Sequence, residues 1–205
     1  MATKLMRVPT DEELTSFLAP LRGKVTIISF HDKDTKVRTF TFLTSCASKL
    51  KAKMQVLDMD AFCSIHVQRL VDVKNSEFPT GMEILLPIHG FSTESLASLI
   101  PSTEFLIIDD LNSLFSLSSA SSQSHQLFAM MKLISYHARI NDSWVLATAY
   151  RSAPTKLTKT NKHSLESLAD FALEATSRDG AITLKGAAVT GWPDDGFAFE
   201  THLET

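Results

Sequence analysis

Residues 24–60 read KVTIISFHDKDTKVRTFTFLTSCASKLKAKMQVLDMD and change pattern along their length. Residues 24–30 are apolar and rich in β-branched side chains, as expected for a strand buried on both faces. After the charged residues 31–36, apolar side chains recur at helical spacing from Phe40 to Leu50, and residues 54–57 form a second apolar run. We therefore predict a loop over 31–36 within a strand–helix–strand unit, which makes the sheet at least partly parallel.

The same alternation continues towards the C-terminus. Further apolar runs predict strands at residues 83–87, 105–108 and 144–147, and a closing antiparallel pair at 181–185 and 197–200. Helical patterns occur at residues 62–73, 92–100 and 127–138, and the serine-rich residues 116–124 predict a flexible loop. The fold class predicted is α/β, with a mostly parallel central sheet flanked by helices and an antiparallel C-terminal edge.

The N-terminal region carries a helix signal of its own. Thr10 precedes Glu13 by three residues, which is a capping box, and Pro20 ends the apolar pattern before a turn at Arg22 and Gly23. We expect an N-terminal helix and lead-in over residues 1–23 and one core domain over residues 24–205. A chain of 205 residues is long enough to bury a core of its own.

Composition excludes several classes of protein. The net charge of −3 argues against a chain devoted to coating nucleic acid, and no apolar run approaches the ~20 residues that span a bilayer. Cys46 and Cys63 indicate neither a disulfide framework nor a metal-ligand spacing. We expect an intracellular protein without cofactor or metal, located in the nucleus if eukaryotic and otherwise in the cytoplasm.

The order of these elements resembles the core of the RecA/RadA-type recombinase superfamily, especially the recombinase paralogs. Residues 58–60 (DMD) are similar to the family's Asp-Thr-Glu-like motif, with Asp60 in the place of the residue that activates water. The apolar strand that ends on Asp109 looks like Walker B, and residues 144–148 (WVLAT) are similar to the next strand of the family. The resemblance covers residues 14–200 and implies a RecA-like core.

The resemblance fails at the phosphate-binding loop, where the family has G-x-x-x-x-G-K-[ST]. Set against this motif without gaps, the chain has Asp32, Thr35 and Val37 where glycines are usual. Glycines let successive backbone N–H groups curl around phosphates, whereas a β-branched residue resists the left-handed conformation. We therefore expect a degenerate nucleotide site and no ATPase activity. The residues of this site are Arg38, Thr39, Asp60 and Asp109.

The acidic residues of this site also have a structural interpretation. An aspartate at the end of a buried strand, such as Asp109, can cap a helix or pair with Arg38 instead of serving a nucleotide. Asp58 and Asp60 have no recognisable partner for acid–base catalysis, and the sequence contains no nucleophile motif.

A basic run follows the strand at residues 144–147. Its cations, with no acidic residue before Glu166, are Arg151, Lys156, Lys159 and Lys162. Such a stretch can be a solvated loop, but the resemblance implies a loop that faces the DNA channel, where cations bind phosphates in a salt-sensitive manner. The serine-rich residues 116–124, at the position of the other DNA-facing loop, carry no Arg or Lys, so we expect weak binding to single-stranded DNA by the chain alone.

Two functions follow from the resemblance. The first is a non-catalytic recombinase paralog, which binds a RecA-type recombinase or paralog subunit and assists filament assembly or remodelling on single-stranded DNA in homologous recombination repair. The residues expected at that interface are Asp109, Asp110, Leu111 and Phe115. The alternative is an ATPase-dead structural subunit of another complex, such as an Elongator-type tRNA-modification ring. A third possibility is an active ATPase with an unusual loop.

Overall fold

One eight-stranded sheet is formed by the residues that the structure describes, in the order β3-β2-β4-β5-β1-β6-β7-β8. The computed structural model describes residues 11–63, 65, 82–85, 103–111, 113, 121–150, 169–178, 181–188 and 198–204. The strands are β1 Val25–Phe30, β2 Met54–Asp58, β3 Met82–Leu85, β4 Phe105–Asp109, β5 Trp144–Tyr150, β6 Phe171–Arg178, β7 Ala181–Ala188 and β8 Ala198–Glu204. The helices are α1 Asp11–Leu18, the 3-10 turn η1 Ala19–Leu21, α2 Lys33–Leu50 and α6 Ser121–Asn141.

The sheet is parallel from β3 to β6 and antiparallel from β6 to β8. This confirms the predicted fold class, including the antiparallel C-terminal edge. Strand β6 was not predicted, although its buried residues alternate from Phe171 through Leu173 to Ala175. That two-residue period is the pattern of a strand with one covered face.

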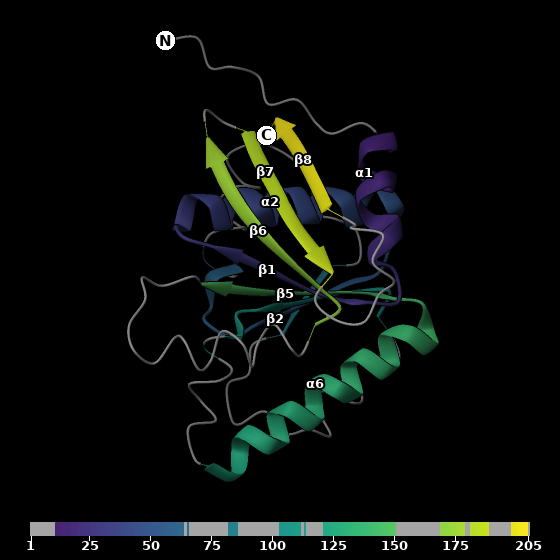
Figure 1. Ribbon diagram of the computed structural model, residues 1–205, viewed down its shortest axis with the longest axis vertical. Coiled ribbons are helices and arrows are strands. Elements are labelled where there is room, and N and C mark those ends of the chain that lie inside the picture. The colour runs from purple at the N-terminus through teal and green to yellow at the C-terminus, as the bar shows by residue number, and fades with distance from the viewer. Residues whose placement is uncertain are drawn as a thin grey trace.

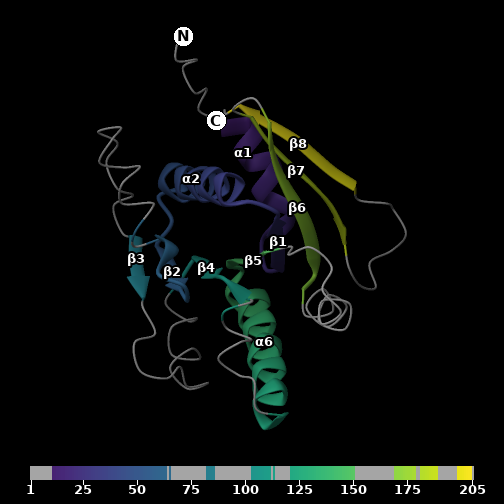
Figure 2. The ribbon, with the colours of Figure 1, turned by 90° about the vertical axis from the view of Figure 1, so that its left-hand side faces the viewer.

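Helices cover both faces of the parallel strands, with α1 and α2 on one side and α6 on the other, and β6, β7 and β8 curve alongside α1 (Figures 1 and 2). Alternate residues of β1 enter the two resulting cores. Ile28 and Phe30 pack in the core with α1 and α2, whereas Val25 and Ile27 pack with α6. Burial on both faces explains why β1, β2 and β4 are nearly continuous apolar runs.

The charged residues 31–36 do not form the predicted loop. Helix α2 begins at Lys33, and Asp32 caps it by accepting a hydrogen bond from the backbone N–H of Thr35 at 2.8 Å. Charged residues are common in the exposed first turn of a helix, and an aspartate is among the best N-caps. The expected helix from Phe40 to Leu50 is therefore the later part of a helix of 18 residues.

Helix α6 begins earlier than expected. Residues 121–124, predicted as part of a serine-rich loop, are helical, while residues 116–120 lie outside the described part of the chain. The serines did not indicate a loop here, because extending an existing helix is easier than starting one. Each residue added to the helix over residues 127–138 gains one hydrogen bond for the one residue that it orders. Of the helices expected at residues 62–73 and 92–100, the second and most of the first also lie outside the described residues.

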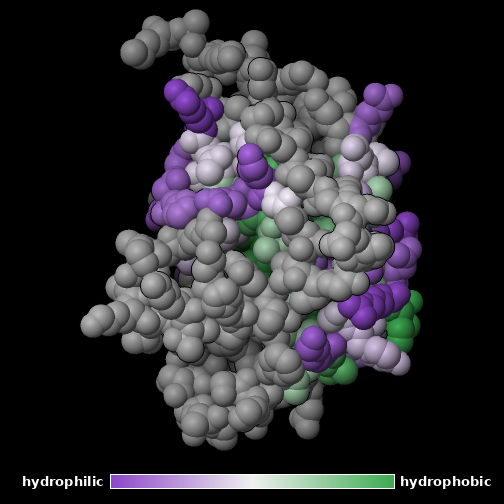
Figure 3. All heavy atoms as spheres, in the orientation of Figure 1, coloured by the Kyte–Doolittle hydropathy of each residue, from purple (hydrophilic) through white to green (hydrophobic). Residues whose placement is uncertain are grey.

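On the face shown in Figure 3 the described residues are largely hydrophilic, with a hydrophobic area over the C-terminal end of α6. Tyr136 and Ile140, one turn apart on α6, are 60% and 61% exposed. None of the described helices has the length and hydropathy needed to cross a membrane.

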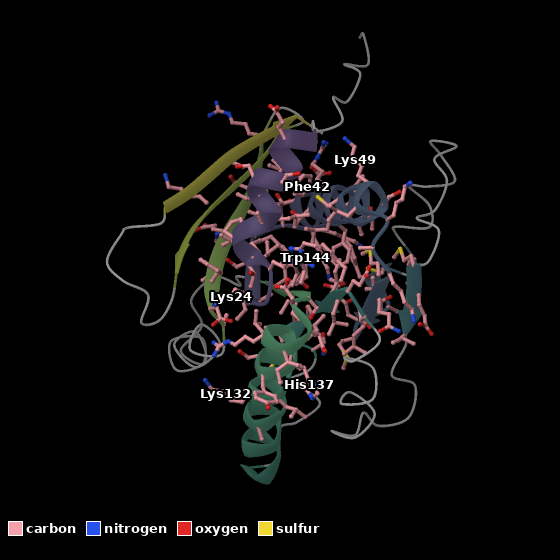
Figure 4. The ribbon with its side chains drawn as sticks, turned by 90° about the vertical axis from the view of Figure 1, so that its right-hand side faces the viewer. Lys24, Phe42, Lys49, Lys132, His137 and Trp144 are labelled. Carbon is pink, nitrogen blue, oxygen red and sulfur yellow. The ribbon has the colours of Figure 1, made fainter. Side chains whose placement is uncertain are left out.

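The N-terminal helix is part of the main core. Phe17 and Leu18 of α1 are buried with the side chains of α2 and β1. Trp144, near the C-terminal end of α1 (Figure 4), donates its indole N–H to the carbonyl oxygen of Leu18 at 2.9 Å. The guanidinium of Arg22 lies 4.9 Å from the centroid of the Trp144 ring. The predicted turn ends at Gly23, whose φ of 69° is easy only for glycine.

Candidate functional site

The carboxyl ends of β1, β2, β4 and β5 lie at one edge of the sheet because these strands are parallel neighbours. Open parallel sheets bind ligands at this edge. Here it carries Asp58 at the end of β2, Asp109 at the end of β4 and Tyr150 at the end of β5. The N-terminus of α2, with Lys36 in its first turns, follows β1 at the same edge.

Lys36 is the central cation of this edge. Its Nζ lies 2.9 Å from Asp109 Oδ1 and 3.1 Å from Asp60 Oδ2, and its side chain is completely buried. Nζ also lies 4.0 Å from the ring centroid of Phe62 and 5.2 Å from that of Tyr150. Burial acts to lower the pKa of Lys36, but Asp109 and Asp60 raise it above the ordinary value of lysine. We call Lys36, Asp60 and Asp109 the lysine triad.

Asp109 is the buried anion of the triad. Besides Lys36, its Oδ1 accepts a hydrogen bond from the hydroxyl of Thr148 on the neighbouring strand β5. Its Oδ2 is buried and has no hydrogen-bond partner among the described residues. Burial raises the pKa of Asp109 to about 7, against the opposing effects of Lys36 and Thr148.

Asp60 is the more open carboxylate, with a side chain that is 27% exposed. Its Oδ1 accepts the backbone N–H of Phe62 at 3.1 Å, across Ala61, which has a φ of 58°. The N–H of Met59 donates to the carbonyl oxygen of Asp109, which ties the end of β2 to the end of β4. These backbone bonds hold the two carboxylates of the triad in place on either side of Lys36.

Two further side chains face this group. Asp58 is the register partner of Asp109 across β2 and β4, and it is 1% exposed. Cys63 is buried, and one ligand atom from each of Asp58, Cys63 and Asp109 lies within 4.8 Å of the other two. Burial strongly raises the pKa of the Cys63 thiol, and the neighbouring Asp109 and Asp58 raise it further.

The turn between β1 and α2 consists of His31 and Asp32 alone. Besides capping α2, the Asp32 carboxylate accepts the hydroxyl of Thr35 at 2.7 Å. These two bonds, the backbone bond first, lower the pKa of Asp32. An anionic side chain thus satisfies the start of the helix, a position that favours negative charge.

The structure separates the predicted site residues. Asp60 and Asp109 lie on either side of Lys36, and Lys36 rather than Arg38 is the cation between them. The Nε of Arg38 contacts Asp34 one helical turn away, at 2.8 Å. Thr39 is buried and donates its hydroxyl to the carbonyl oxygen of Thr35 within α2. Lys36 reaches the two carboxylates because α2 begins directly after the short turn at His31 and Asp32.

The predicted interface residues that the structure describes are buried within the chain. Asp109, Asp110 and Leu111 are exposed by 0%, 3% and 0%, and Leu111 packs in the core with α6. These side chains therefore offer no exposed contact surface in this structure. Phe115 and the basic run of Arg151, Lys156, Lys159 and Lys162 lie outside the described residues.

No protein-family model matches the chain, and no curated protein matches it. A solved structure titled "Crystal structure of the RadB recombinase" resembles it with a TM-score of 0.66, covering 96% of this chain and 94% of that chain. The chain has a RecA-type fold. The sequence identity over this match is 13%, so the likeness concerns the fold.

Within this RecA-type fold, the sequence analysis did not predict four side chains of the candidate site: Lys36, Cys63, Thr148 and Tyr150. Only Lys36 had a clear signal. It precedes Phe40 by four residues, so it continues the apolar face of α2 by one turn, and a lysine on such a face needs a buried partner. The other three are ordinary strand and helix residues until the sheet brings their ends together.

Proposed function

We propose that this chain is a non-catalytic subunit with a RecA-type fold, which binds a RecA-type recombinase or paralog and assists filament assembly or remodelling on single-stranded DNA. The likeness to the RadB recombinase in fold supports the choice of partner class. RecA-type subunits assemble head-to-tail, and a subunit can keep such a heterologous interface after losing its own chemistry.

The lysine triad carries the non-catalytic part of the proposal. The buried Lys36 already pairs with Asp60 and Asp109, at 3.1 and 2.9 Å. A nucleotide phosphate could recruit this lysine only by displacing a carboxylate. Removing one partner from a buried ion pair costs about 3–5 kcal/mol, because the other charge stays buried without compensation. Phosphate binding would have to exceed that cost.

The short turn before α2 adds a second obstacle to nucleotide binding. A phosphate-binding loop presents several backbone N–H groups to the ligand. Here strand and helix are separated by His31 and Asp32 only, and Asp32 itself takes the N–H of Thr35. A phosphate at this place would also face the negative charge of Asp32.

The DNA part of the proposal depends on the basic run. Arg151, the first of its four cations, directly follows Tyr150, the last residue of β5 at the edge of the triad. The ring centroid of Tyr150 lies 5.2 Å from Lys36 Nζ. The basic run therefore directly follows a strand that ends at this edge, and we propose that its cations bind nucleic-acid phosphates.

Unfolding in the presence of Mg-ATP tests the non-catalytic part. A ligand at 100 times its Kd stabilises by about 2.7 kcal/mol, which raises the Tm of a domain this size by roughly 5–10 °C. We expect no such rise for this chain. A clear rise in Tm, or ATP turnover above that of a Lys36→Ala variant, would contradict the proposal.

Binding to labelled single-stranded DNA tests the basic run. Replacing Arg151, Lys156, Lys159 and Lys162 with alanine should weaken binding and flatten its salt dependence by roughly 0.7 log unit per lost phosphate contact. The control removes four exposed lysines away from this edge: Lys49, Lys53, Lys132 and Lys185. Lys49 and Lys132 lie at the far end of α2 and on α6 (Figure 4). An equal effect of both variants would show that only net charge matters.

Affinity capture with the full chain tests the partner class. Recombinase-type subunits should be recovered together with this chain, and the quadruple alanine variant should recover them equally well. Recovery of subunits of a tRNA-modification ring instead would overturn the recombination part of the proposal.

A further inference from the structure

The buried group formed by Asp58, Cys63 and Asp109 has the composition of a metal site. One ligand atom from each lies within 4.8 Å of the others, and all three residues are buried. Tetrahedral zinc, with bonds of about 2.3 Å to sulfur and 2.0–2.2 Å to oxygen, keeps its ligand atoms roughly 3.5 Å apart. Small side-chain adjustments therefore suffice to bring these three atoms to zinc distance.

The register of the sheet places the carboxylates of Asp58 and Asp109 on the same face. Asp58 and Asp109 are register partners on the parallel strands β2 and β4. Side chains alternate along a strand, and the preceding Leu57 and Ile108 both belong to the core with α6. Asp58 and Asp109 therefore both point to the face of α2, where Cys63 belongs to the same core as α2.

A second observation singles out one oxygen. Lys36 and Thr148 both contact Oδ1 of Asp109, whereas Oδ2 is buried without a hydrogen-bond partner among the described residues. A buried carboxylate oxygen without a partner is costly, and native structures rarely leave one. A cation bound at Oδ2 would satisfy it without disturbing the contact with Lys36.

The local charge balance points in the same direction. Two carboxylates, from Asp60 and Asp109, lie 3.1 and 2.9 Å from the ammonium of Lys36. A buried excess of negative charge is compensated by protonation or by a bound cation. A thiol that lies among carboxylates becomes a strong ligand once a metal ion replaces its proton.

We propose that Asp58, Cys63 and Asp109 form a binding site for zinc or a similar thiophilic divalent ion. The donor set of two carboxylates and one thiolate favours zinc over magnesium, which prefers oxygen ligands in octahedral geometry. When zinc binds, the Cys63 Sγ–H bond breaks, the thiolate donates its electron pair to the metal and the proton passes to solvent. Three protein ligands leave a fourth coordination position for water.

Titration of the full, tag-free chain with zinc tests this site. We expect one zinc ion per chain by native mass spectrometry and a higher Tm with zinc but not with equal magnesium. X-ray absorption of the zinc-loaded chain should show one sulfur ligand near 2.3 Å together with oxygen ligands. Absence of zinc binding, or a first shell without sulfur, would overturn the proposal, and this measurement needs no variant.

The two cysteines supply a matched pair of variants. Cys63→Ser should lower zinc affinity by roughly tenfold or more, since even the loss of an outer partner of a ligand costs 10- to 100-fold. Cys46→Ser, at the other buried thiol of the same core, should leave affinity unchanged and keep the sulfur signal. Equal loss in both variants, or loss only in Cys46→Ser, would refute the assignment to Cys63.

Discussion

Replacing Lys36 with methionine should destabilise the protein strongly above pH 7 and only weakly near pH 5.5. Methionine keeps most of the volume of the lysine side chain but removes its charge. At pH 8.5 the Asp109 carboxylate, which is fully buried, would lose the ammonium that lies 2.9 Å away. A buried carboxylate left uncompensated costs about 3–5 kcal/mol, but a group with a pKa of about 7 takes up a proton instead, which limits the extra loss at pH 8.5 to about 2 kcal/mol.

The pH dependence follows from the carboxyl group of Asp109. Its pKa is about 7 in the folded protein, above the ordinary 3.8. The folded state therefore holds a proton that the unfolded chain releases between these values, and the contribution of Asp109 to stability falls by roughly 3.5 kcal/mol as pH rises from 4 to 7. Without Lys36 the folded pKa rises further, so stability keeps falling above pH 7. The difference in unfolding free energy between wild type and Lys36→Met therefore grows above pH 7.

At pH 5.5 Asp109 is protonated in wild type and in Lys36→Met. The stability lost in the variant is then only that of the contact between Lys36 and Asp60. That carboxylate is 27% exposed, and a partly exposed pair contributes about 1 kcal/mol or less. Urea unfolding followed by circular dichroism measures both values. With a slope of about 2–3 kcal/mol per molar urea, the midpoint should shift by roughly 1 M at pH 8.5 and by less than about 0.5 M at pH 5.5.

Arg38→Met is the control, because it removes a neighbouring cation from the same helix. Arg38 contacts Asp34 on the helix surface, a pair for which about 0.5 kcal/mol is expected at both pH values. If Lys36→Met costs the same at pH 5.5 and 8.5, the charge of Lys36 is not coupled to Asp109. The reasoning about the triad would then be wrong.

Three further predictions concern the backbone around the site and the antiparallel edge. Asp32→Ala removes the N-cap of α2 and should lower stability by about 1 kcal/mol at pH 7, with the difference shrinking below pH 4 as the wild-type carboxylate is protonated; an unchanged urea midpoint would contradict this. Ala61→Gly relieves a φ of 58° and should raise stability by up to about 1 kcal/mol, whereas a loss would show that Ala61 is not strained. Gly186→Ala should cost about 3 kcal/mol or more, because a Cβ there would overlap the carbonyl oxygen of Ala172 and lie 2.8 Å from the Cα of Leu173. Thr183→Ala on the same strand should cost far less, and similar midpoints for the two variants would count against the close approach of β6 and β7.

The local hydrophobic pattern predicted the strands correctly wherever both faces of the strand are buried. The apolar runs of β1, β2, β4 and β5 were predicted because helices cover both faces of the parallel strands. Polar composition led to wrong loop predictions at residues 33–36 and 121–124, which are helical. The same composition is typical of an exposed first turn of a helix and of a loop. Strand β6 was missed because only one of its faces is covered.

The candidate site divides in the same way. The sequence alone predicts that Asp60 and Asp109 follow parallel strands, whose carboxyl ends lie at one edge of the sheet whatever the details of packing. It could not determine that Lys36 is their cation, because this depends on where α2 begins, and a single capping contact from Asp32 settles that. It also could not bring Cys63 to Asp58 and Asp109, which lie within 4.8 Å of one another only through strand register and the turn after β2. Strands and their ends are set by side chains a few residues apart, whereas the chemistry of this edge is set by contacts between residues far apart in the chain.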